Sequence, residues 1–184
     1  MSLSLTSHQM GQLGDLSRTL LAPHEFADLN AWGEAAAERS AALFRASKVA
    51  FHCVPGVGHD PLLGACGVGR DALHQYMTEL ADLDEGMRRV RQAGLTAWHD
   101  AQVYTPEDRT RSAFAAEYLI PHRIRSFAGM FTPVGDGGYS AMWITDDRPD
   151  HDLLGHAVVP LMQELLVPAL RAGARAAARA AGAG

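Results

Sequence analysis

The chain has 184 residues, a formal net charge of −5 and a pI near 5.9, which excludes electrostatic attraction to nucleic acid or to an anionic membrane. Hydrophobic residues make up 47% of the sequence and charged residues 20%, as in one soluble globular domain with a real core. No signal peptide and no apolar run of about 20 residues is visible, so we expect a cytoplasmic protein with no membrane span.

Two helices are expected at the N-terminus. Leucines recur at helical spacing over residues 5–21, Ser7 is the candidate N-cap, and Pro23 ends the segment. The second helix is expected over about 24–46, with an apolar stripe suited to packing on a sheet. We expect residues 1–22 to serve in dimerisation, because a helix outside the sheet leaves an apolar stripe to bury.

A β-hairpin and a long helix follow. Residues 48–54 (KVAFHCV) and 62–68 (LLGACGV) are rich in strand formers and flank a turn at 55–58. The closely spaced glycines of the second strand indicate close approach of a neighbouring element. A single helix is expected over about 72–93, with Asp71 as its cap and Gly94 at its end.

The segment 95–104 is ambiguous between a short strand and irregular structure. Thr105 and Pro106 then form a strong helix start, and this helix is expected to run to about Leu119. A last helix is expected over about 153–180, opened by Asp150 or Asp152, and two internal prolines predict a kink or break in it. Its tail, 171–184, carries a basic stripe that we interpret as the solvated face of a linker helix rather than as a nucleic-acid contact. The stripe consists of Arg171, Arg175 and Arg179.

The segment 123–147 is expected to form the central hairpin, with its turn at the sequence Gly-Asp-Gly-Gly of residues 135–138. A four-residue turn pairs Val134 with Tyr139 and Met130 with Trp143. One face then holds Ala128, Met130, Val134, Tyr139 and Trp143, and the other holds Phe127, Phe131, Met142 and Ile144. Because both faces are apolar, both should be covered, one by helices and the other by a cavity or lid.

The predicted fold class is therefore α+β. A central antiparallel sheet of five or six strands is expected, with helices packed on one face and a loop- or helix-covered pocket on the other.

The candidate site is an apolar cavity beside the central hairpin. Aromatic and thioether side chains gather near the predicted sheet, and a few polar groups among them could orient a ligand. The alternative that these residues simply fill a core stays open. The candidate ligand-binding residues are His52, Trp98, His99, Tyr104, Phe127, Met130, Phe131, Ser140, Met142 and Trp143.

No pattern for a metal, a cofactor or catalysis is found. The nine histidines include no His-Glu-x-x-His pair, and the two cysteines, Cys53 and Cys66, form no Cys-x-x-Cys, so we expect neither metal nor cofactor. A haem held by His52 or Cys53 is disfavoured, and the cysteines are interpreted as buried thiols. Ser140 lies outside any Gly-x-Ser-x-Gly motif, so no catalytic residue is assigned. An enzyme acting on a small molecule or using a redox cysteine remains the alternative.

Five short segments carry a family resemblance. They are Leu29–Trp32, Tyr104, Glu117–Pro121, Gly137–Gly138 and Glu164–Leu170. With the order of elements, they resemble the GAF-type (PAS-like) sensory domain that precedes a LuxR-type helix-turn-helix in bacterial transcription regulators. The resemblance covers about residues 19–172, and Ala169 stands where the family often has a histidine.

This resemblance implies a ligand-sensing domain over residues 23–170 that works as a homodimer. It implies an unknown small-molecule ligand, and DNA binding only through a helix-turn-helix that is not part of this chain. A dimerisation scaffold without a ligand is the alternative.

Overall fold

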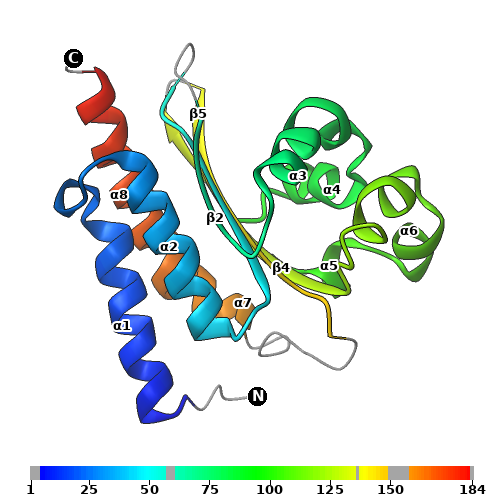
Figure 1. The fold of residues 1–184 in the computed structure, drawn as a ribbon, viewed down its shortest axis with the longest axis horizontal. Helices are drawn as coiled ribbons and strands as arrows, with labels where there is room; N and C mark the ends of the chain where they lie inside the picture. Colours follow the sequence, from blue (N-terminus) through cyan, green and yellow to red (C-terminus); the bar gives the residue numbers. More distant parts are fainter. Residues whose placement is uncertain (1–4, 57–60, 136, 149–157, 183–184) are drawn as a thin grey trace.

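The computed structural model describes residues 5–56, 61–135, 137–148 and 158–182. Within them a single five-stranded antiparallel sheet has the strand order β2-β1-β5-β4-β3, with helices on both faces (Figure 1). The strands are β1 (Lys48–Val54), β2 (Leu62–Cys66), β3 (Ala97–His99), β4 (Ser126–Gly135) and β5 (Gly138–Asp146). The expected α+β fold with a central antiparallel sheet is confirmed.

One face of the sheet is covered by the two ends of the chain. This layer consists of α1 (Ser7–Leu21), α2 (Leu29–Phe44), α7 (Val158–Leu161) and α8 (Val167–Gly182) (Figure 1). The indole nitrogen of Trp32 on α2 donates a hydrogen bond of 2.7 Å to the carbonyl of Thr19 on α1. A Cβ on Gly173 of α8 would lie 1.7 Å from the carbonyl oxygen of Leu20, so these backbones touch. The apolar stripe of α1, including Leu16, is therefore buried within the chain itself.

The helix starts in this layer differ from the predicted ones. α1 is capped by Thr6 rather than by Ser7, in a capping box in which the Thr6 side chain and Gln9 exchange hydrogen bonds. α2 begins after Asp28, whose carboxylate accepts from the backbone of Ala31. The predicted second helix is therefore shortened at its start, and residues Pro23–Glu25 form only a short 3₁₀ turn.

The other face of the sheet is covered by short helices. They are α3 (Arg70–Gln75), α4 (Glu85–Ala93), α5 (Asp100–Val103) and α6 (Pro106–Arg111) (Figure 1). The single helix predicted over 72–93 is wrong. A π-helical turn (Tyr76–Leu80) and a 3₁₀ turn (Ala81–Leu83) interrupt it, and Asp84 starts α4 afresh by accepting a hydrogen bond of 2.9 Å from the backbone of Met87.

The segment between α4 and the central hairpin partly matches its prediction. Gly94 ends α4 in the left-handed conformation, and the ambiguous stretch that follows forms β3 and α5. Thr105 caps α6 with Pro106 in its first turn, as expected. The helix does not continue to Leu119, because it ends at Arg111 and a separate π-helical turn covers Ala115–Leu119.

The last helix is interrupted where its prolines predict a break. A π-helical turn (Met162–Leu166) separates α7 from α8, and the backbone of Val167 bonds to the carbonyl of Met162. This wider turn comes directly before Pro168, whose nitrogen cannot donate a hydrogen bond. The proposed start of this helix at Asp150 or Asp152 lies outside the described residues.

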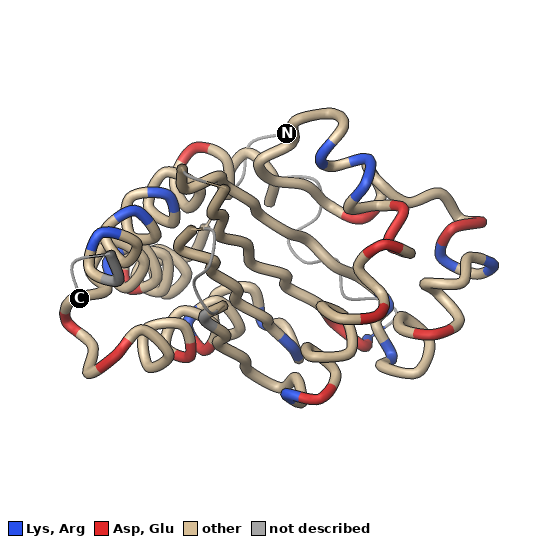
Figure 2. The backbone as a smooth tube through the Cα atoms, turned by 90° about the horizontal axis from the view of Figure 1, so that it is seen from above, with Lys and Arg blue, Asp and Glu red and all other residues tan. Residues whose placement is uncertain are grey.

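The basic stripe of α8 is mostly exposed. Figure 2 shows basic positions following one another along the helix next to the C-terminus. Arg175 and Arg179 are exposed, whereas Nε of Arg171 donates a hydrogen bond of 2.8 Å to the hydroxyl of Thr132 in the sheet. One of the three arginines therefore links α8 to β4 rather than facing solvent freely.

The central hairpin forms as expected, but the predicted register is wrong along most of its length. At the turn Gly135 pairs with Gly138, as a four-residue turn requires; Asp136 lies outside the described residues. A β-bulge at Val134 then shifts β4 by one residue, beside Pro133, which cannot donate a ladder hydrogen bond. Beyond the bulge Gly129, not Met130, lies opposite Trp143.

This shift changes the faces of the sheet, because a slip of one residue turns every side chain to the other side. Met130 pairs with Met142, and both belong to the core beneath the terminal helices. The opposite face carries Phe127 and Phe131 together with Tyr139 and Trp143. The predicted grouping, with Met130 beside Trp143 and Met142 beside Phe127, is thus corrected.

Candidate functional site

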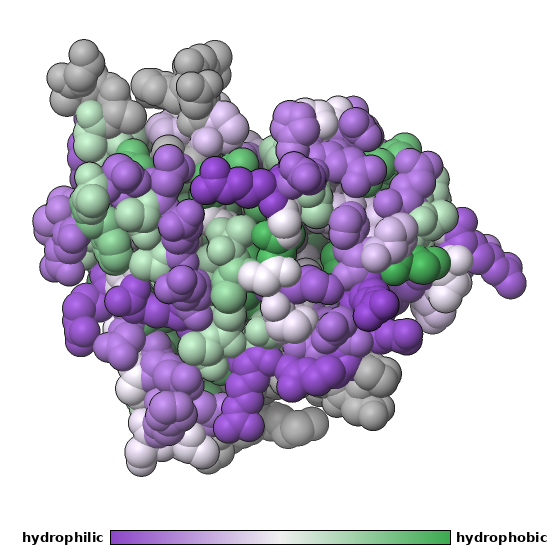
Figure 3. All heavy atoms as spheres, in the orientation of Figure 1, coloured by the Kyte–Doolittle hydropathy of each residue, from purple (hydrophilic) through white to green (hydrophobic). Residues whose placement is uncertain are grey.

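A pocket of about 120 Å³ lies between the sheet and the layer formed by α3 to α6. Strands β1, β4 and β5 form its floor, and the broken helix of residues 70–93 forms much of its cover. A second hollow of about 300 Å³ adjoins it and shares the side chains of Tyr76, Met77, Met87 and Trp143. Figure 3 shows hydrophobic residues gathered in the seam between the two layers.

Five of the ten predicted ligand-binding residues line the first pocket. They are His52, Trp98, Tyr104, Phe127 and Trp143. Phe131 lines the adjoining hollow together with Trp143. These residues come from four strands and one connecting segment that are distant in sequence, and the sheet brings them together.

The other four residues lie elsewhere. Met130, Ser140 and Met142 face the terminal helices, since the bulge at Val134 sets which residues of β4 lie opposite those of β5. The hydroxyl of Ser140 donates to the carbonyl of His52 at 3.2 Å, and Sδ of Met142 lies 2.9 Å from the hydroxyl of Ser40.

The fourth of these residues, His99, contacts Asp100 and does not line either pocket. Its Nδ1 lies 3.0 Å from a carboxylate oxygen of Asp100, whose other oxygen contacts Arg109 at 3.0 Å and accepts from the backbone of Phe127. Burial tends to raise the pKa of Asp100, but these partners outweigh burial and hold that pKa below its usual value. The carboxylate therefore fastens α5 and α6 to β4 at the edge of the pocket.

Asp84 and Tyr76 are the functional candidates that sequence reasoning missed. The side chain of Asp84 is buried, and its carboxylate accepts hydrogen bonds from the phenols of Tyr76, at 2.9 Å, and Tyr104. Burial raises the pKa of Asp84, although the bonds from Tyr104, Met87 and Tyr76 oppose this effect. The sequence contains one signal for this role, because an aspartate is a preferred N-cap residue and Asp84 lies three residues before Met87.

The two phenols keep their protons throughout the ordinary pH range. Burial is the main cause that raises the pKa of both Tyr76 and Tyr104, and the nearby carboxylate of Asp84 adds to it. They therefore act as hydrogen-bond donors toward the carboxylate.

Rings pack closely around this polar centre. The ring of Tyr104 meets that of Phe127 edge to face at 4.8 Å, and Phe114 stacks on Tyr118 at 5.4 Å. Two glycines make room for rings: a Cβ on Gly86 would lie 1.9 Å from Tyr104, and one on Gly129 would lie 2.3 Å from Trp98. The pocket is thus bordered by aromatic surface with few polar points.

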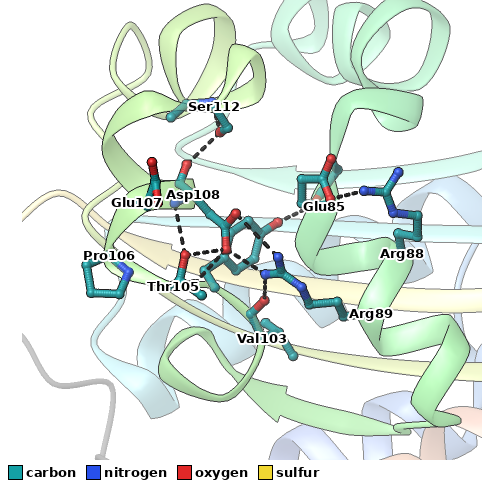
Figure 4. A network of polar contacts seen from close by, with 12 residues as sticks. Glu85, Arg88, Arg89, Val103, Thr105, Pro106, Glu107, Asp108 and Ser112 are labelled. Carbon is teal, nitrogen blue, oxygen red and sulfur yellow. Dashed lines mark hydrogen bonds and ion pairs between the residues drawn. The ribbon is translucent and has the colours of Figure 1, made fainter.

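An ion-pair network holds the covering layer together (Figure 4). The guanidinium of Arg89 on α4 contacts Asp108 of α6 at 2.6 and 3.3 Å and donates to the carbonyl of Val103 at 2.7 Å. Asp108 also accepts from the backbone of Thr105 at 2.7 Å, which completes the cap of α6. The hydrogen bond from Arg89 lowers the pKa of Asp108 to about 2.

The cysteines are not arranged for redox chemistry. In the register of β1 and β2, Cys53 pairs with Leu62 and Cys66 with Val49, so the two free thiols lie at opposite ends of the hairpin. Burial raises the pKa of Cys53 to about 11, which keeps it a thiol.

The described ranges contain no group of three or more histidine, cysteine or acidic side chains that could hold a metal ion. Within those same ranges, no helix has the length and apolar character needed to cross a bilayer.

No protein-family model matches the sequence, and no curated protein matches it. Solved structures do match. The LBD domain of VqsR from Pseudomonas aeruginosa has a TM-score of 0.64 at 12% identity, covering 91% of this chain and 97% of that one. The N-acylhomoserine lactone dependent LuxR family transcription factor CepR2 from Burkholderia cenocepacia has a TM-score of 0.61 at 13% identity, covering 97% and 100%.

SdiA in complex with octanoyl-rac-glycerol matches with a TM-score of 0.60 at 9% identity, over 98% of this chain and 69% of that chain. The phycocyanobilin-bound GAF domain of a cyanobacterial phytochrome matches with a TM-score of 0.54 at 15% identity, over 95% and 97%. At these identities the likeness establishes the fold. The chain therefore has the fold shared by GAF domains and by the ligand-binding domains of LuxR-type regulators.

Proposed function

We propose that this chain is the ligand-sensing domain of a bacterial transcription regulator. The observation that carries the proposal is the ring-lined pocket between the sheet and α3 to α6, with the buried carboxylate of Asp84 at its border. Apolar walls with a few oriented polar groups are typical of sites for small ligands. The fold shared with ligand-binding domains supports the same reading.

The ligand we propose is a small acylated molecule. The aromatic and aliphatic walls suit an acyl chain, and the few polar points suit one compact head group. The names of two similar structures support this class, since one is N-acylhomoserine lactone dependent and the other holds octanoyl-rac-glycerol.

The signal would leave the domain through its terminal helices. Those helices pack on the face of the sheet opposite the pocket, so a ligand that favours one arrangement of the sheet shifts the helices as well. A DNA-binding helix-turn-helix outside this chain would read that shift.

The proposed homodimer uses the same helix layer. The apolar stripe of α1 around Leu16 is already buried within the chain. Met10, Leu21 and Leu165 on this layer, however, are each at least half exposed. These exposed apolar side chains are the candidates for a contact with a second copy of the chain. Light scattering at high protein concentration tests this part, and a monomer contradicts it.

Binding is tested by titrating the purified protein with N-octanoyl homoserine lactone and with octanoyl-rac-glycerol. Isothermal titration calorimetry should show saturable binding of at least one of them, and the Tm should rise with ligand concentration because only the folded state binds. Native mass spectrometry of freshly purified protein reports any retained molecule. If neither probe binds and nothing is retained, the sensing proposal is wrong.

A further inference from the structure

The pocket has two groups of polar atoms, and they differ in whether their hydrogen bonds are already made. Both carboxylate oxygens of Asp84 are occupied: one accepts from Tyr76, and the other accepts from Tyr104 and from the backbone of Met87. This group is satisfied without a ligand. A ligand that approached it would have to displace existing hydrogen bonds.

The second group lies on the floor of the pocket and is unsatisfied. His52 is only 2% exposed, and neither of its ring nitrogens has a hydrogen-bond partner within the described part of the chain. The indole nitrogen of Trp143 is buried as well and equally lacks a partner there. Buried polar atoms are nearly always paired, so three unpaired ones in one place call for an explanation.

The fold brings these atoms together. His52 of β1 pairs with Ala141 and Trp143 of β5 pairs with Ala50, so the two side chains are diagonal neighbours on one face of the sheet. Their ring centroids are 6.4 Å apart, and both side chains line the pocket. The ring of Tyr139 packs edge to face against His52 at 5.1 Å, which offers the imidazole an aromatic contact rather than a hydrogen bond.

We propose that His52 and Trp143 form the polar subsite of this pocket and bind a neutral carbonyl or hydroxyl group of the ligand. The proposal rests on the ligand-sensing function proposed above and names the atoms that would receive the head group. The indole offers one donor, and a neutral imidazole offers one donor and one acceptor. A carbonyl oxygen can accept from the indole, and a hydroxyl can both accept and donate.

The surroundings favour a neutral group over an ion. Burial lowers the pKa of His52 to about 4, so the imidazole is uncharged at neutral pH and cannot pair with a carboxylate. Among the residues that the structure describes, Lys48 is the one lysine or arginine lining this pocket, and it already donates to the carbonyl of His122 at 2.6 Å. The Asp84 carboxylate at the pocket border would repel an anion further.

The test compares the affinities of four proteins for the two acyl probes, N-octanoyl homoserine lactone and octanoyl-rac-glycerol, by isothermal titration calorimetry. The proteins are the wild type, His52→Phe, Trp143→Phe and the control His74→Phe, which makes the same change at an exposed position of α3 outside the pocket. Each pocket variant should weaken binding by roughly 2- to 12-fold, the loss of one net hydrogen bond, and the control should not.

Two further measurements separate a binding role from a structural one. His52→Phe should raise the Tm of the ligand-free protein by a few degrees, because it removes two buried unpaired nitrogens, while it weakens binding. In a ¹H–¹⁵N spectrum the indole signal of Trp143, identified by its loss in Trp143→Phe, should move downfield when a probe is added. The signal of Trp32 should stay, because its indole already donates to Thr19.

The outcomes distinguish the two proposals. If the wild type binds a probe and both pocket variants bind it equally well, the subsite is refuted and the sensing function stands. If the Tm of ligand-free His52→Phe falls, the two nitrogens are already satisfied and the subsite is again refuted. If the wild type binds neither probe and retains no small molecule, the sensing function fails and the subsite fails with it.

Discussion

The phenol of Tyr76 lies 2.9 Å from a carboxylate oxygen of Asp84, eight residues further along the chain. Two structural features together make this contact possible. The π-helical turn Tyr76–Leu80 interrupts the regular helix, and Asp84 leaves the helical conformation to cap α4. Asp84 therefore ends one helical segment through its backbone, and its carboxylate starts the next segment and holds the ring of Tyr76.

Replacing Asp84 should lower the free energy of unfolding, and by more when more of its hydrogen bonds are lost. Asp84→Ala removes the cap of α4 and leaves two buried phenols without an acceptor, which should lower the free energy of unfolding by about 2–4 kcal/mol. Asp84→Asn keeps an oxygen for the backbone of Met87 and should cost about 1 kcal/mol. Urea denaturation measures both values. If Asp84→Ala were as stable as the wild type, the cap and the bonds to the phenols would not contribute to stability.

Gly86 should not tolerate a side chain. A Cβ there would overlap the ring of Tyr104, so Gly86→Ala should displace this ring, break its bond to Asp84 and destabilise the protein by about 1–3 kcal/mol. The matched control is Gly11→Ala on α1, where nothing lies within 4 Å of the new Cβ. This control should instead stabilise by roughly 0.5–1 kcal/mol, because alanine is the better helix former. Thermal unfolding should show a lower Tm for Gly86→Ala and a higher Tm for Gly11→Ala than for the wild type.

His52 should make stability depend on pH below neutrality. Its pKa is about 4 in the folded protein and about 6.5 in the unfolded chain, so the unfolded state binds more protons between these values. Stability should therefore fall as the pH drops through this window, by about 2 kcal/mol between pH 7 and pH 5. The difference in free energy of unfolding between the wild type and His52→Phe, measured across this pH range, separates the contribution of His52 from that of other titrating groups. A constant difference across the window contradicts the buried neutral imidazole.

The Arg89–Asp108 pair should contribute to stability over a different, more acidic pH range than His52. The folded pKa of Asp108 is about 2, below its unfolded value near 3.9, so its contribution is present above pH 4 and is lost as the pH falls toward 2. Asp108→Asn should cost about 1 kcal/mol at pH 7 and almost nothing near pH 2, since the partly exposed pair is screened by water. Glu107→Gln, which loses only an exposed contact to Arg111, should change stability by less than about 0.5 kcal/mol.

The two hairpins and the ends of several helices could be predicted because their signals are local. Thr105 and Pro106 start α6 and Gly94 ends α4 through backbone preferences that depend on few neighbours. The closely spaced glycines of β2 predict close approach of a neighbouring element, and Gly64 indeed lies against the backbone of Gly33 on α2. These features need only the residue and its immediate surroundings.

The pocket itself was harder to predict. Apolar residues continue at helical spacing on both sides of Asp84, so periodicity alone gave one long helix and left Tyr76 in an ordinary core position. The lining side of the hairpin depended on a bulge whose only local signal was Pro133 within a strand. A set of contacts assembled from distant segments cannot be read from spacing within one segment.

The bulge at Val134 gives β4 one residue more than its pairing with β5 requires. A deletion of Val134 would therefore join Pro133 to Gly135 and keep the existing partners of both, at the cost of one packed side chain. In a regular strand the loss of one residue turns the following side chains to the other face, so we expect this hairpin to tolerate a one-residue deletion better than most. A one-residue gap at this place between related chains would therefore leave the residues that line the cavity unchanged.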